Sequence, residues 1–160
     1  MSAVDQPADQ STAYHEAGHA VMALALGRPV ACVSVRPGRE FLGTCHFGKA
    51  VFRPSEDWLE REALIALAGP AAEARLTGAY AWDAGARDQT YAEGLALQRA
   101  GGARQAQRLM RRLLAKAEYL LARPDNWRAV ERLAAELLRL GEISGRAARH
   151  LYDESLREER

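Results

Sequence analysis

Apolar residues recur at helical spacing over most of the chain. The first such segment begins at Ser11 or Thr12, either of which can cap a helix, and it runs to about Leu26. Gly27 follows as a favourable residue for ending that helix. Residues 1–10 are polar and lack this period. We therefore expect a disordered leader over 1–10 and one folded domain over 11–157.

A different pattern occupies the segment after the first helix. Residues 30–36 are rich in valine and partly alternate between apolar and polar positions, which predicts a β-strand. Pro37-Gly38 indicates a turn, and residues 41–52 can return as a second strand. The expected product is a small hairpin or a three-stranded sheet.

Helical periodicity resumes near Ser55 and continues to the end of the chain. Gly78 ends the first of these helices, and Pro70 should kink it. Further helices are expected over 87–100, 103–122, 127–140 and 144–156. The predicted fold class is mainly α (α+β): one helical domain with a small β-hairpin or sheet.

Composition and charge narrow the choice of partners. The chain has 160 residues, is 48% hydrophobic and 27% charged, and carries a formal net charge of +1. A nearly neutral chain does not indicate nucleic acid as a partner. The basic residues gather in the last third of the sequence, among acidic residues on predicted helices, and we interpret them as a solvated surface.

Two cysteines, Cys32 and Cys45, are too few for a disulfide scaffold, and we expect free thiols. Residues 1–11 do not have the pattern of a signal peptide. No apolar run approaches the roughly 20 residues that a membrane helix needs. These features predict a cytoplasmic location and no membrane span.

The segment His15-Glu16-Ala17-Gly18-His19 has the pattern His-Glu-x-x-His inside the first predicted helix. Four residues make about one helical turn, so both imidazoles project from one face and can bind one ion. Zn²⁺ is well suited to neutral imidazole, and Glu16 beside the pair can act as a general base toward water. Small residues in this turn leave room for a metal and a substrate.

A catalytic zinc site usually has three protein ligands, so a third is needed from elsewhere in the chain. The candidate third ligands are Asp88, Asp83, Glu73, His46 and Cys45. Asp88 opens a predicted helix after a glycine-containing loop. Spacing alone does not decide between Asp83 and Asp88.

Several segments, in their order along the chain, resemble the peptidase domain of the FtsH family of zinc proteases. They are TAYHEAGHAV, VSVRPG, ALAGPAAEARLTG, GARDQTYAEGLA and ERLAAELLRLGEISG, and they span about residues 10–145. The resemblance implies a zinc-dependent metalloendopeptidase that acts on unfolded or extended polypeptides. It also implies that Asp88 is the third ligand.

In that family an edge strand beside the zinc pairs with extended substrate. By resemblance, Val33, Ser34, Val35 and Arg36 would supply this edge. Family members couple the domain to an ATPase and a membrane anchor and form hexamers, whereas this chain contains neither module. Pro70 also replaces a residue that is usually basic. The partners to consider are thus a polypeptide substrate, further copies of this chain and a separate ATPase.

Two other functions remain as alternatives. A catalytically inactive FtsH-like domain could act as a binding or regulatory module, which the absence of an ATPase motivates. A helical module over residues 103–157 could bind nucleic acid or another partner, which the excess of basic residues there motivates. The intact His-Glu-x-x-His segment favours the enzyme.

Overall fold

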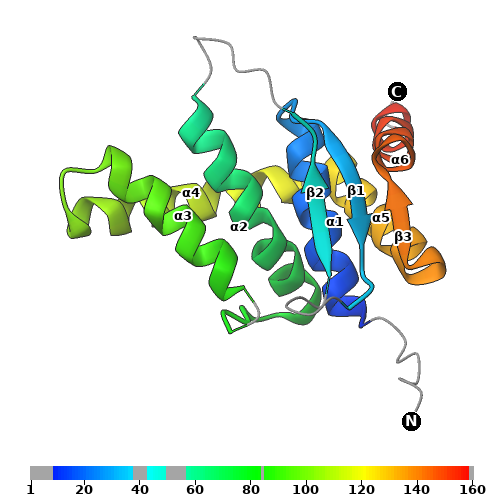
Figure 1. The fold of residues 1–160 in the computed structure, drawn as a ribbon, viewed down its shortest axis with the longest axis horizontal. Coiled ribbons are helices and arrows are strands. Elements are labelled where there is room, and N and C mark those ends of the chain that lie inside the picture. The colour runs from blue at the N-terminus through cyan, green and yellow to red at the C-terminus, as the bar shows by residue number, and fades with distance from the viewer. Residues whose placement is uncertain (1–8, 38–42, 50–56, 84, 159–160) are drawn as a thin grey trace.

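The computed structural model describes residues 9–37, 43–49, 57–83 and 85–158, and within these the fold is mainly helical with a small antiparallel sheet (Figure 1). Its elements are α1 (Gln10–Ala25), β1 (Val30–Ser34), β2 (Thr44–Phe47), α2 (Trp58–Thr77), α3 (Ala86–Arg99), α4 (Ala103–Ala122), α5 (Pro124–Leu140), β3 (Glu142–Ser144) and α6 (Gly145–Arg157). The predicted fold class is confirmed.

Helix α1 begins earlier than the sequence pattern suggests. Asp9 is its N-cap, and the carboxylate of Asp9 accepts a hydrogen bond from the backbone N–H of Ser11. A leader that extends to residue 10 is therefore wrong for Asp9 and Gln10, while residues 1–8 lie outside the described part. The helix ends as expected, with Gly27 in the left-handed conformation at φ 80°.

The three strands form one sheet in the order β2-β1-β3, with both pairs antiparallel. Sequence reasoning identified β1 and β2 but missed β3, whose residues lie more than 100 positions after β1. In this order β1 is the central strand. The expectation that Val33–Arg36 supplies a free edge is therefore not met at Val33 and Ser34, which pair on both sides, while the N–H of Val35 donates to the carbonyl of Gly141.

Helices α1 and α2 pack closely at the centre of the molecule. A Cβ on Gly18 would lie 2.5 Å from the carbonyl oxygen of Ala68 and 2.6 Å from the Cβ of Ala72, so only glycine permits this approach. Asp57 caps α2, and Gly78 ends it in the left-handed conformation. Ser55, near which the helical pattern resumes in the sequence, lies outside the described residues.

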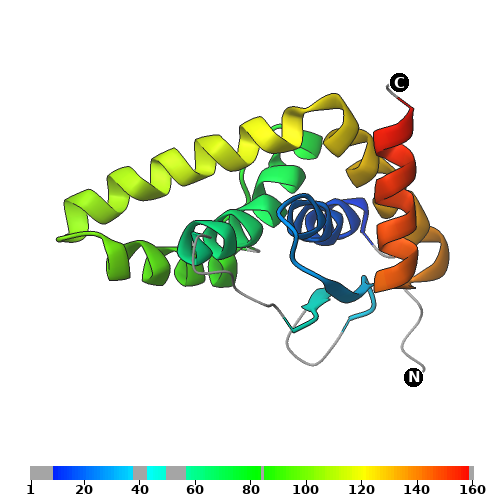
Figure 2. The same ribbon diagram turned by 90° about the horizontal axis from the view of Figure 1, so that it is seen from above.

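The remaining helices cover the central pair on two sides. Helices α3 and α4 meet at Gly101 and diverge from that turn, while α5 and α6 lie at the other end of the molecule (Figure 2). Pro124 occupies the first turn of α5, where its missing N–H costs nothing. In the same view α4 runs along one side, and the strands lie on the opposite side of α1 and α2.

None of the helices among the described residues is both long enough and apolar enough to span a lipid bilayer.

Candidate metal centre

Helix α1 presents two histidines side by side. His15 and His19 are one turn apart, and their ring centroids lie 4.8 Å from each other with the rings at 74°. Each residue is only 8% exposed. A buried, helical His-x-x-x-His pair of this kind is distinct from two histidines on a solvated surface, since both rings are held in place by their surroundings.

A carboxylate from a distant part of the chain reaches both rings. Asp88 lies in the first turn of α3, and its Oδ2 is 2.9 Å from His15 Nε2 and 3.3 Å from His19 Nε2. The glycine before this helix allows the close approach, because a Cβ on Gly85 would come within 3.0 Å of the ring of Pro70. The α2 proline thus packs against the loop that delivers Asp88.

These three side chains form the one cluster of potential metal ligands found within the described ranges. One ligand atom from each of His15, His19 and Asp88 lies within 4.8 Å of the others. Of the alternatives that spacing left open, Asp83, His46 and Cys45 do not belong to the cluster. The structure therefore brings together the three residues predicted as ligands, and it favours Asp88 over Asp83.

Helix α2 holds both imidazoles from behind. Glu73 Oε2 lies 2.9 Å from His15 Nδ1, and the carbonyl oxygen of Ile65 lies 2.8 Å from His19 Nδ1. Both oxygens accept, so each Nδ1 donates, and in the neutral ring each Nε2 then carries a lone pair toward Asp88. Glu73 was a candidate ligand from sequence, but its place is behind His15 as an orienting group.

A glycine in the middle of α2 makes the space for these rings. A Cβ on Gly69 would lie 2.3 Å from His19 Nε2 and 2.8 Å from His15 Nε2. No side chain larger than hydrogen fits there without displacing a ring. Sequence reasoning did not single out Gly69, although an unexplained glycine inside an apolar helical pattern is the signal that could have identified it.

The charges of the cluster stabilise one another. Burial disfavours the charged form of His15, but hydrogen bonds to Asp88 and Glu73 outweigh burial and raise the pKa of His15 to about 9. Burial would raise the pKa of Asp88, yet the neighbouring His19 and His15 hold it well below its ordinary value. In the metal-free cluster the protonated His15 ring and the ionised Asp88 carboxylate therefore balance each other's charge at the place where a cation could bind.

Glu16 lies beside the cluster and is nearly enclosed. It is 7% exposed, and burial raises its pKa although the nearby His19 and His15 oppose that shift. The residue just before β2 lies against it, since a Cβ on Gly43 would lie 3.0 Å from Glu16 Cγ. A carboxylate with a raised pKa next to a cation site can both accept and return a proton.

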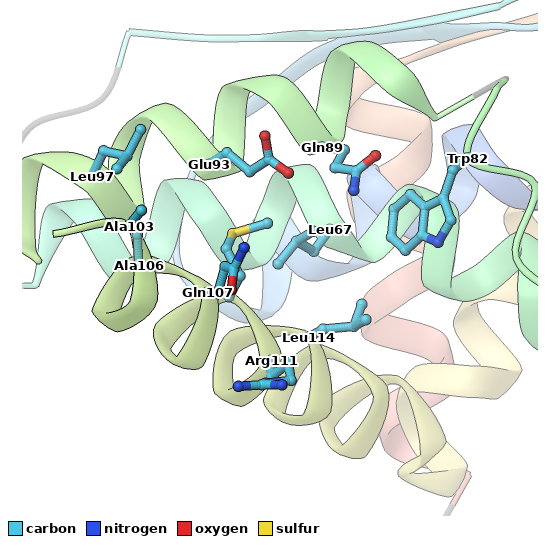
Figure 3. Close-up of a pocket in the computed structure, with 11 residues that line it drawn as sticks. Leu67, Trp82, Gln89, Glu93, Leu97, Ala103, Ala106, Gln107, Arg111 and Leu114 are labelled. Carbon is cyan, nitrogen blue, oxygen red and sulfur yellow. The ribbon is translucent and has the colours of Figure 1, made fainter.

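A groove with a volume of about 490 Å³ lies elsewhere, between α2, α3 and α4 (Figure 3). Trp82 closes one end of it, and Leu67 forms part of its floor. The residues that line it do not include the three candidate ligands. Trp82, which lies in the loop before Asp88, faces this groove.

Comparison with known proteins does not assign a family. Neither the protein-family models nor the curated proteins contain a match to this chain. The resemblance of its motifs to the FtsH peptidase domain therefore stays a prediction, and the site has to be judged on its geometry.

Proposed function

We propose that this chain is a zinc-dependent metalloendopeptidase that hydrolyses unfolded or extended polypeptides. The observation that carries the proposal is the convergence of His15, His19 and Asp88 with Glu16 beside them. Asp88 lies at least 69 positions after the two histidines in the sequence. A fold that buries such a cluster and aims it at one point has the arrangement that a three-ligand metal site requires.

The donor set fits zinc better than the common alternatives. Two imidazole nitrogens and one carboxylate oxygen are typical of catalytic zinc sites, whereas Mg²⁺ and Ca²⁺ prefer oxygen ligands throughout. Glu73 and the Ile65 carbonyl supply the partners behind the imidazoles that such sites usually have. When bound, zinc would supply Lewis acidity toward a peptide carbonyl and lower the pKa of water.

Glu16 supplies the proton transfer in this proposal. Its carboxylate accepts a proton from the attacking water, and it returns that proton to the amide nitrogen of the leaving peptide. Burial keeps Glu16 poorly solvated, which raises its pKa and makes its carboxylate a stronger base toward the attacking water. His15 and His19 remain fixed by α2 during this exchange.

The strand that borders the site offers a place for extended substrate. β2 is a terminal strand of the sheet among the described residues, and its start lies over Glu16. An extended peptide can add to such an edge through main-chain hydrogen bonds with little sequence preference. We therefore place the substrate along β2 (Thr44–Phe47), in place of the central strand that the resemblance suggested.

The decisive experiment measures zinc content and casein cleavage on the same purified samples. Wild type should hold close to one zinc per chain and cleave unfolded casein, and a chelator should abolish cleavage. Asp88→Ala should lose both zinc and cleavage. Asp83→Ala is the matched control, because Asp83 is an exposed carboxylate in the same loop and lies outside the cluster.

The variant Glu16→Gln distinguishes the loss of proton transfer from the loss of zinc binding. This variant should keep its zinc and lose at least about a hundredfold in turnover, because the amide cannot accept the proton. Full turnover in Glu16→Gln would overturn the mechanism. Stoichiometric zinc without cleavage by wild type would instead support the inactive binding module.

A further inference from the structure

Helix α4 carries a continuous basic face on the outside of the molecule. Arg104, Arg108, Arg111 and Arg112 are all exposed and stand at positions i, i+4, i+7 and i+8, which share one side of a helix. Arg111 lies at the margin of this side and also lines the groove between α2, α3 and α4. Tyr119 lies further along the same side and is 72% exposed. The buried positions of α4 occupy the opposite side. We refer to the four arginines as the α4 arginine face.

The α4 arginine face differs from the other basic residues of the chain. Many of those have an acidic partner, as in the pairs Arg28–Glu62, Arg36–Glu142, Arg99–Asp57, Lys116–Glu60 and Arg132–Glu158. Within the described part of the chain, no ion pair involves any of the four arginines of this face. A solvated helix surface ordinarily mixes both signs of charge.

Like charges one turn apart repel each other and destabilise a helix slightly. Arg104 and Arg108 form such a pair, and so do Arg108 and Arg112. The one acidic residue of α4, Glu118, lies beyond the arginines and accepts a hydrogen bond from Tyr80, so an anionic surface would relieve this repulsion. Arginine also binds phosphate and carboxylate groups through two parallel hydrogen bonds, which lysine cannot do.

We propose that the α4 arginine face binds an anionic phospholipid membrane surface. From Arg104 to Tyr119 the stripe is about 22 Å long and straight, as a helix rises 1.5 Å per residue. Helix α4 runs along one side of the molecule with this face outward, so a flat surface can touch the whole stripe (Figure 2). Tyrosine favours the headgroup region, and Tyr119 lies at the end of the stripe.

The other anionic partners fit this face less well. A specific protein interface needs a buried apolar core, and the stripe offers one aromatic side chain. A nucleic acid is normally met by a broad positive field or by several stacking aromatics, whereas this chain has a net charge of +1. A localised row of arginines without apolar anchors favours a reversible electrostatic contact with headgroups.

This contact would leave the proposed active site facing away from the bilayer. In Figure 2, α4 lies along one side of the molecule, and β2 lies on the opposite side of α1 and α2. A chain that rests on α4 would therefore present β2 to the aqueous phase. Membrane binding through α4 does not require peptidase activity.

The test is co-sedimentation of the full chain with vesicles of phosphatidylcholine alone or mixed with phosphatidylserine. Wild type should bind the mixed vesicles only, and raised salt should weaken binding because it screens surface charges. The variant R104Q/R108Q/R112Q should bind about a hundredfold more weakly, since each arginine near an anionic surface contributes about fivefold. Glutamine is a good helix former, so α4 should persist.

The matched control R139Q/R146Q/R157Q removes the same net charge from exposed positions on α5 and α6. It should bind mixed vesicles nearly as well as wild type. Equal losses in both variants would reduce the effect to overall charge and overturn the proposal. Binding of duplex DNA without binding of mixed vesicles would overturn it in favour of a nucleic-acid surface. Wild type that binds neither would also overturn it.

Discussion

Gly69 leaves the space that the two imidazole rings of the candidate centre occupy. Replacing it with alanine puts a methyl carbon 2.3 Å from His19 Nε2, inside the position of the ring. We expect Gly69→Ala to weaken zinc binding at least about tenfold, because displacement of an orienting contact has effects of that size. Zinc affinity from chelator competition measures this loss.

Gly94 provides the control for that substitution. It lies in the middle of α3, and nothing stands within 4 Å of an added Cβ. Gly94→Ala should leave zinc affinity unchanged and stabilise the fold by about 0.5–1 kcal/mol, since alanine is the better helix former. Equal zinc affinity in both variants would show that α2 has room for the methyl group and that Gly69 does not define the position of the rings.

Protons should compete with zinc at His15. The pKa of His15 is raised to about 9 in the metal-free protein, so the ring is charged at pH 7 and must lose a proton to bind zinc. Zinc affinity should therefore rise about tenfold per pH unit between about pH 7 and 9 for each proton released. The heat of binding in buffers of different ionisation enthalpy counts those protons directly.

His15 also links pH to the stability of the metal-free fold. This stability falls as pH rises, whereas zinc affinity increases. Because the folded-state pKa of His15 is raised, its contribution to stability is complete below the unfolded value near 6.5 and disappears as pH rises through about 9.

Glu73→Gln should lower the pKa of His15 by removing one of its two carboxylate partners. The rise in zinc affinity should then level off at lower pH, and an unchanged profile would exclude Glu73 from this role.

At the scale of elements, the features set by neighbouring residues could be predicted from the sequence, whereas the pairing of distant strands could not. The helices followed from apolar periodicity, and the histidine pair followed from one turn of α1. β3 did not, because Glu142–Ser144 is three residues long and pairs with a strand far away in sequence. Its pairing makes β1 central, so the edge strands of the sheet could not be identified from the sequence around β1 alone.

A substitution at Val33 tests whether this residue belongs to the core of a central strand or to a substrate-binding edge. It is fully buried and paired on both sides, so its side chain belongs to the core. Val33→Ala should lower the free energy of unfolding by about 2 kcal/mol through loss of buried apolar surface. KM for a peptide substrate should stay unchanged in the folded fraction. A raised KM with unchanged stability would restore Val33 to the substrate strand.

At the scale of the whole molecule, the candidate centre connects two helices that the sequence separates widely. α1 supplies two ligands and α3 supplies one, and the intervening α2 packs against both. The order of motifs indicated Asp88 only by resemblance, because no local pattern reports which loop folds back onto α1. A ligand that binds both helices in the folded state alone must stabilise the entire fold.

Zinc should therefore raise the unfolding temperature of the whole domain. With free zinc at a thousandfold over its dissociation constant, the folded state gains about 4 kcal/mol, which corresponds to about 8–16 °C for a chain of this size. Asp88→Ala should lose most of this shift, and Asp83→Ala should retain it, because only the former removes a ligand. Differential scanning calorimetry at fixed pH measures the shift. An equal response of both variants would mean that zinc acts elsewhere on the chain, and α1 and α3 would then not be joined through the metal.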